Sequence, residues 1–176
     1  MSSPSAGAGH SSTSGNLAER ATLALSRMPH AQQMGVCLGA CTEDLGLVLR
    51  LPFQQRLIGN MQLPAIHGGV IGSFMQITAL VAAFTQLGER RPPRFIDFSI
   101  DYLSHAVPED LLARCSFQRI GRRVAAVSIS CWQSDENTPV AVARAHLFAA
   151  AVNAAPRAVP AAGQAAIPCP VGRRPG

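Results

Sequence analysis

The stretch from His67 to Leu87 constrains the fold more than any other part of the chain. It contains no Asp, Glu, Lys or Arg, and its apolar residues at positions 70, 71, 74, 77, 81 and 84 recur with helical spacing. Ala82 and Ala83 widen this apolar stripe to nearly the whole circumference, which is typical of a helix that is buried on most sides. We therefore expect one long central helix that other elements must enclose.

The predicted helix begins at His67-Gly68-Gly69, after a loop that contains Asn60 and Pro64. The first backbone N–H groups of any helix lack partners within the helix, and two glycines leave them uncovered. The helix dipole adds partial positive charge at the same place. This start is therefore a place where a negatively charged oxygen would be stabilised.

After the helix, the apolar period changes from about 3.6 residues to about 2, as expected for strands. Strands are predicted over residues 95–102, 111–119, 124–133 and 140–148, and the last of these, rich in Val and Ala, is expected to be central and buried. Residues 35–51 predict a hairpin that precedes the helix. This order indicates an α+β fold in which a curved antiparallel sheet wraps around the helix. Such a sheet has exposed edges, so we expect a dimer with a joined sheet.

The ends of the chain are expected to lie outside this domain. Residues 1–16 are rich in Ser, Gly and Ala and predict a disordered N-terminus, and residues 17–33 predict a short N-terminal helix that Pro29 ends. The main domain is predicted over residues 34–150 and a disordered Ala/Pro-rich tail over residues 151–176.

Composition narrows the classes of function. The net charge is +5, and every basic residue is Arg, but no basic run is interleaved with aromatics, so nucleic acid is not an expected partner. The five cysteines show no CxxC and no paired spacing, so neither a disulfide framework nor a metal site is predicted. Polar residues interrupt the apolar run, which disfavours a membrane span, and the first residues lack the features of a secretory signal. A cytoplasmic protein is expected.

Four motifs carry a resemblance to a known family. They are G-N-x(6)-H-G-G before the helix, D-F-S-I-D-Y-L after it, the G-R-R turn at residues 121–123, and P-V-A-V-A-x-A-H in the last strand. In this order they resemble the hotdog fold, in the acyl-CoA thioesterase subgroup of the phenylacetate-degradation (PaaI-like) type. The resemblance covers residues 34–148. It implies a homodimeric or homotetrameric protein that binds an acyl-CoA thioester, with coenzyme A as part of the substrate and no other cofactor.

The resemblance also assigns roles to residues. It implies that the backbone N–H of Gly68 holds the thioester carbonyl, that His67 orients the site, and that Asn60 helps to hold the carbonyl. Gly121, Arg122 and Arg123 correspond to a turn where relatives contact the phosphates of coenzyme A. Each residue also has a structural explanation, such as a turn at Asn60 or close packing at Gly68.

One departure from the family bears on catalysis. Relatives usually carry Asp or Glu nine residues after the His, as general base or nucleophile, and this chain has Gln76 there. An amide cannot take a proton at neutral pH, but it can position a water by hydrogen bonding. Phe95 is a second departure, because several relatives have Ser or Thr there.

Two hypotheses follow. The first is an acyl-CoA thioesterase that hydrolyses a small or aromatic acyl-CoA to the free acid and coenzyme A, with Gln76 holding the water. The second is a non-hydrolytic protein that binds acyl-CoA or an acyl carrier and has lost its catalytic carboxylate. A dehydratase would need a His and carboxylate pair that the sequence does not place.

Overall fold

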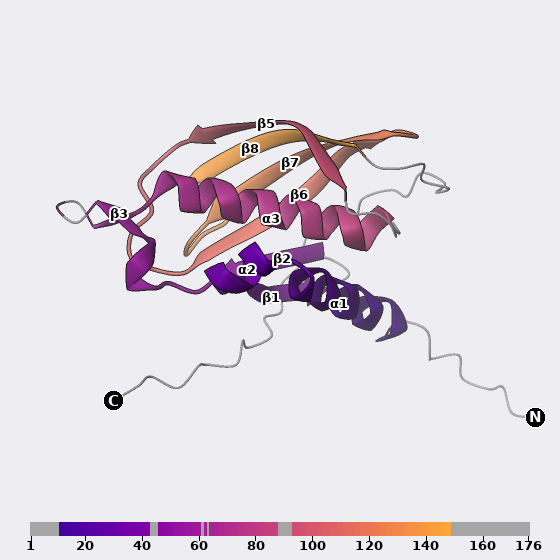
Figure 1. Cartoon of the computed structure of the whole chain (residues 1–176), viewed down its shortest axis with the longest axis horizontal. Helices are drawn as coiled ribbons and strands as arrows, with labels where there is room; N and C mark the ends of the chain where they lie inside the picture. The colour runs from indigo at the N-terminus through magenta and orange to yellow at the C-terminus, as the bar shows by residue number, and fades with distance from the viewer. Residues whose placement is uncertain (1–10, 43–45, 61, 63, 88–92, 149–176) are drawn as a thin grey trace, which may run out of the picture.

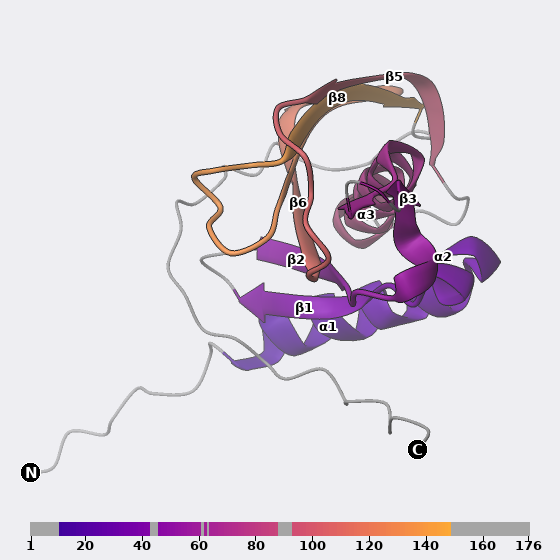
Figure 2. The ribbon, with the colours of Figure 1, turned by 90° about the vertical axis from the view of Figure 1, so that its left-hand side faces the viewer.

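The structure is a computed structural model that describes residues 11–42, 46–60, 62, 64–87 and 93–148. Six antiparallel strands form one sheet in the order β1-β2-β6-β7-β8-β5. The sheet curves around the long helix α3, with β5 and β8 on one side and β1 and β2 on the other (Figure 1, Figure 2). This arrangement confirms the predicted α+β hotdog fold with a curved sheet around a central helix.

The elements follow the expected order along the chain. The helices are α1 (Ser11–Ser26), α2 (Pro29–Met34) and α3 (Gly68–Leu87), with a short 3₁₀ turn η1 at Gln55–Leu57. The sheet contains β1 (Cys37–Thr42), β2 (Gly46–Leu51), β5 (Arg94–Tyr102), β6 (Leu111–Ile120), β7 (Val124–Trp132) and β8 (Ala141–Phe148). A separate two-stranded ribbon pairs β3 (Ile58–Asn60) with β4 (Ala65–Ile66).

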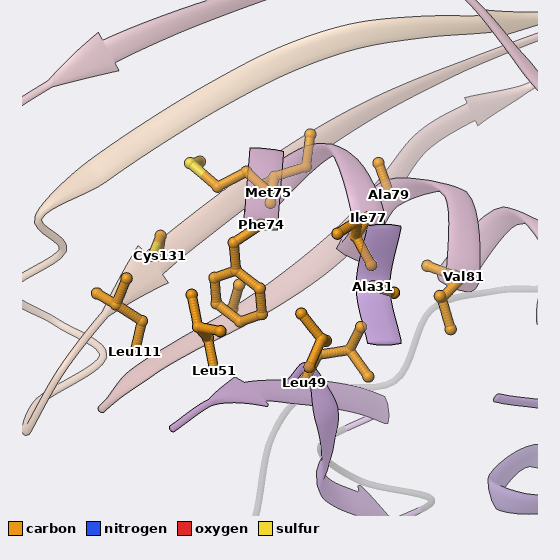
Figure 3. Packing of buried hydrophobic residues seen from close by; sticks show 14 of the residues in the cluster. Ala31, Leu49, Leu51, Phe74, Met75, Ile77, Ala79, Val81, Leu111 and Cys131 are labelled. Carbon is orange, nitrogen blue, oxygen red and sulfur yellow. The ribbon is translucent and has the colours of Figure 1, made fainter. Parts of the chain in front are cut away.

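The core lies between α3 and the concave face of the sheet. Phe74 and Met75 of α3 are fully buried, and Phe74 points toward Leu49 and Leu51 of β2 (Figure 3). Cys131 of β7 is also fully buried and lies on the same side (Figure 3). Burying apolar surface on several sides of α3 explains why its sequence is apolar around most of its circumference. By length and composition alone α3 could cross a membrane, but the sheet encloses it as the core helix.

The strands after α3 alternate between a buried inner face and a polar outer face. In β8, Ala141, Ala143, Ala145 and Leu147 are buried, whereas Arg144, His146 and Phe148 are exposed. β8 is thus an interior strand of the sheet, as predicted, and its burial is confined to its inner face. β8 lies between β7 and the edge strand β5, and no described element covers its outer face.

The N-terminal region differs from the prediction in where the helices begin. α1 begins at Ser11, within the segment that was predicted to be disordered, and Ser and Thr are residues that favour helix starts. Pro29 follows the end of α1, as predicted, and is also the first residue of α2, a position that tolerates Pro because no N–H is needed there. The tail predicted over residues 151–176 lies outside the described residues, as do residues 43–45 within the predicted hairpin.

α1 covers the open side of the helix and sheet core. The Arg20 side chain donates a hydrogen bond to the Phe84 carbonyl of α3 over 3.1 Å. Ala21 and Ala24 are buried at the same contact surface. The N-terminal helix therefore belongs to the same core as the rest of the domain.

Candidate functional site

The start of α3 is held in place by the β3–β4 ribbon. In this ribbon Asn60 pairs with Ala65, and the His67 backbone N–H donates to the Leu57 carbonyl over 2.9 Å. A Cβ added at Gly59 would lie 2.7 Å from the His67 ring and 2.8 Å from its Cα, so only glycine fits there. The ribbon thus places Gly59 against His67 at the start of α3, with Asn60 next to Gly59 in β3.

His67 caps the helix with both its backbone and its side chain. Its carbonyl accepts hydrogen bonds from the backbone N–H groups of Val70 and Ile71, at 2.9 and 3.2 Å. Its Nδ1 accepts a hydrogen bond from the Gly69 N–H over 2.9 Å. His67 as a whole is exposed, although its Cδ2 edge lies against Gly59.

The Gly68 N–H differs from its neighbours because no acceptor for it is present among the described residues. It lies at the positive end of a helix of 20 residues, where partial charges stabilise an anionic oxygen. The geometry therefore leaves one backbone donor available for a ligand, beside the exposed ring of His67.

Asn60, which lies in β3 of the same ribbon, has a structural role. Its Oδ1 accepts a hydrogen bond from the Gln62 backbone N–H over 2.9 Å, which stabilises the turn of the ribbon. This contact supports the turn explanation for Asn60.

Gln76 follows Gly72 by one helical turn, so the two residues share a face of α3. This face also contains Gly68 and Gly69. Gln76 is half-buried, and no described residue hydrogen-bonds its side-chain amide. The amide therefore lies about two turns along the helix from the Gly68 N–H, a rise of about 12 Å along the axis before the reach of the side chain is counted.

Tyr102, which the sequence analysis did not single out, contacts the same face of the helix. It is the last residue of β5, and its hydroxyl donates a hydrogen bond to the Gly68 carbonyl over 2.8 Å. The alternation of apolar and polar residues in the sequence places Tyr102 on the apolar face of its strand, and this alternation was the signal that its ring faces the helix. Residue spacing alone did not reveal that this face meets the start of α3.

The three residues of the G-R-R turn lie at the opposite end of the sheet. The turn joins β6 to β7, and the first residue of β7, Val124, pairs with Phe148 of β8. Phe148 in turn pairs with Arg94, the first residue of β5. Tyr102, which contacts Gly68, is the last residue of β5 and therefore lies at the other end of the sheet. The Gly121 N–H donates to the Val124 carbonyl over 2.8 Å, and an added Cβ would lie 2.9 Å from that oxygen. The tight turn therefore explains why glycine occupies this position. Arg122 and Arg123 are exposed, and within one protomer they are not adjacent to Gly68.

Other reactive side chains lie away from the helix start. Asp97 pairs with His146, with 2.9 Å between the carboxylate and Nδ1, and both residues lie on the outer face of the sheet. Burial raises the pKa of the Cys131 thiol to about 12 because the thiolate would be desolvated. Cys131 is therefore a neutral core residue and not a nucleophile. An open hollow of about 400 Å³ is lined by Phe53, Pro108, Glu109, Asp110, Gln133 and Ser134, and no predicted site residue lines it.

The chain is similar to known proteins over most of this domain. Residues 63–140, which include the start of α3, match the model of the thioesterase superfamily. A solved structure from Chromobacterium violaceum is 36% identical over 76% of this chain and 93% of its own, with a TM-score of 0.60. A structure from Pseudomonas aeruginosa is 30% identical over 76% of this chain and 98% of its own, with a TM-score of 0.67.

A third solved structure shows similarity of fold. The PaaI protein of the phenylacetic acid degradation operon of Escherichia coli is 17% identical over 78% of this chain and 95% of its own, with a TM-score of 0.65. Comparison with curated protein sequences returns no match. The family match, the two relatives and the shared fold together show that this chain belongs to the thioesterase superfamily, with a hotdog fold.

Proposed function

We propose that the protein hydrolyses a small or aromatic acyl-CoA thioester to the free acid and coenzyme A. The observation that carries this proposal is the Gly68 N–H, which has no acceptor among the described residues and lies at the start of the 20-residue helix α3. A thioester carbonyl placed against it would become more negative in the transition state, and the fixed donor would stabilise that charge. In this proposal Asn60 also helps to hold the carbonyl.

The reaction needs a water on the opposite side of the carbonyl carbon. In this proposal Gln76 holds that water by hydrogen bonds, and the water oxygen attacks the carbonyl carbon as the C–S bond breaks. The thiolate of coenzyme A leaves, and the proton of the attacking water passes to that thiolate or to solvent. Because an amide is not a base, we expect turnover about 10²–10⁴ times slower than with a carboxylate.

A homodimer completes the proposed site. β5 lies at the edge of the sheet, and no described strand pairs with its other side. Two β5 strands paired antiparallel would join the sheets and place the Arg94 end of one beside the Tyr102 end of the other. Arg122 and Arg123 would then approach the Gly68 of the partner subunit, where they would bind the phosphates of coenzyme A. A soluble, cytoplasmic dimer without further cofactor is consistent with this arrangement.

The test is thiol release from a panel of short-chain and aromatic acyl-CoA thioesters, with the natural protein, Gln76→Ala and Gln76→Glu. We expect slow turnover by the natural protein and a loss of about 10-fold or more in Gln76→Ala, because the water loses its hydrogen-bond partner. Leu80→Met, on the same helix, is the matched control. Equal turnover by the natural protein and Gln76→Ala would contradict the role of Gln76.

The second candidate function is a non-hydrolytic acyl-CoA or acyl-carrier-binding protein, and Gln76 itself is the observation that favours it. In this case the natural protein releases no thiol but binds coenzyme A in calorimetry. Hydrolysis gained by Gln76→Glu would show that the remainder of the site is intact and lacks only a base.

A further inference from the structure

Tyr102 is connected to the start of α3 by one hydrogen bond and by close packing. Its hydroxyl lies 2.8 Å from the Gly68 carbonyl oxygen, although the two residues are 34 positions apart. A Cβ added at Gly68 would lie 3.3 Å from the phenol ring, and one added at Gly72 would lie 3.5 Å from the hydroxyl. The ring therefore lies along the face of α3 that carries both glycines.

The same peptide unit continues the connection to His67. The Gly68 carbonyl and the Gly69 N–H belong to one planar, conjugated amide. This N–H donates to Nδ1 of His67 over 2.9 Å. A chain of hydrogen bonds thus runs from the Tyr102 hydroxyl through the Gly68–Gly69 peptide to the imidazole. Donation to the carbonyl polarises the amide and makes its N–H a stronger donor.

These hydrogen bonds determine which ring nitrogen of His67 carries the proton. A ring nitrogen that accepts a hydrogen bond from a backbone N–H cannot itself bear a proton, so the neutral imidazole carries its proton on Nε2. The ring is also confined on its other side, because Gly59 packs against Cδ2 with no room for a Cβ. His67 is therefore held with Nδ1 toward the helix and Nε2–H as its remaining donor.

We propose that Tyr102 is a positioning residue that acts through the Gly68–Gly69 peptide to hold His67 as its Nε2–H tautomer and to hold the Gly68 N–H in place. This inference rests on the proposed function, because it assigns the Gly68 N–H and His67 to thioester binding. Tyr102 is 51% exposed and its ring flanks the path from Gly68 toward Gln76, so it also forms a wall beside the bound acyl group.

The test compares the natural protein with Tyr102→Phe, which keeps the ring and removes the hydroxyl. We expect kcat to fall by about 5–10-fold, the equivalent of one hydrogen bond, while KM stays within about twofold because the ring remains. Ser99→Ala, an exposed residue on the outer face of the same strand, is the matched control and should change neither constant.

A second measurement does not depend on turnover. Long-range ¹H–¹⁵N NMR of the His67 ring should show the Nε2–H tautomer in the natural protein near pH 8. In Tyr102→Phe we expect a mixture of tautomers and faster amide hydrogen exchange at Gly69, with exchange at Val81 unchanged. If the natural protein shows the Nδ1–H tautomer, the inference is wrong, whether or not the variant folds.

The two readouts separate the two proposals. A natural protein that releases no thiol but shows the tautomer shift in Tyr102→Phe would overturn the hydrolytic function and support the positioning role. A natural protein that turns over, with kcat and the tautomer unchanged in Tyr102→Phe, would overturn the positioning role and leave the hydrolytic function standing.

Discussion

At the scale of single residues, the site depends on how closely two backbone segments approach each other. Gly59 lies against His67 with no space for a side chain, and its backbone dihedral angle is ordinary, so the requirement is space and not conformation. In the sequence, Gly59 is recognisable only as part of the G-N-x(6)-H-G-G motif. The structure adds the reason, which is that β3 must pass directly over the histidine that caps α3.

Gly59→Ala should therefore lower the free energy of unfolding by about 1–3 kcal/mol, because the added methyl group must push β3 away from His67. Urea unfolding measures this change. Gly72→Ala is the control, since its Cβ would meet its nearest neighbour at 3.5 Å and alanine favours the helix. If both variants lost the same stability, the close contact at Gly59 would not be the cause.

At the scale of elements, α3 determines both the core and the site. Its buried faces pack against the sheet. Its remaining face carries Gly68 and Gly72, which lie beside Tyr102, and Gln76 of the proposed site. Because α3 contributes its buried faces to the core and a different face to the proposed site, a substitution on a buried face should mainly lower the free energy of unfolding.

Phe74→Ala should lower the free energy of unfolding by about 3–5 kcal/mol, because it leaves a cavity between α3 and the β2 side chains that Figure 3 shows around it. Leu80→Ala is the comparison on the same helix, and it should lose less because Leu80 is only half-buried. Urea denaturation gives both values. A loss at Phe74 no greater than at Leu80 would mean that the core tolerates the cavity by collapsing around it.

At the scale of the whole molecule, the position of the G-R-R turn bears on how two protomers would share a site. Arg122 and Arg123 lie at the opposite end of the sheet from Gly68, so one chain does not place them beside its own carbonyl donor. The proposed antiparallel pairing of β5 strands resolves this separation, because it brings opposite ends of two sheets together. The arginines would then act on the partner's site and not on their own.

A double variant, Arg122→Ala with Arg123→Ala, should raise KM for acyl-CoA by about 10-fold or more as two charge-assisted contacts to phosphate are lost. KM for an acyl-pantetheine thioester, which lacks the nucleotide phosphates, should not change. Arg119→Ala, an exposed neighbour on β6, is the matched control. An equal rise in KM for both thioesters would contradict phosphate binding by this turn.

Mixed dimers would show which protomer the arginines serve. Protomers with the double arginine change should be co-expressed with protomers that carry His67→Ala. If arginines act across the dimer, half of the sites in a mixed dimer hold all the natural residues, and low-KM turnover returns. If they act within one protomer, no site is complete and low-KM turnover stays absent.

The sequence by itself determined the elements of this fold, because the change from helical to alternating apolar spacing records which faces are buried. It also predicted His67, Gly68 and Asn60 as site residues, which lie in or next to the β3–β4 ribbon. It placed the start of α1 six residues late, and it predicted a central, buried β8 without indicating that only the inner face is buried.

Only the tertiary structure decided the contacts between distant segments. Tyr102 meets Gly68 because the curved sheet brings the end of β5 over the start of α3, and no spacing along the chain encodes that meeting. The separation of the arginine turn from the helix start is likewise a result of strand direction and sheet order. Local patterns determine which residues are buried, whereas the path of the chain in space decides which distant residues touch.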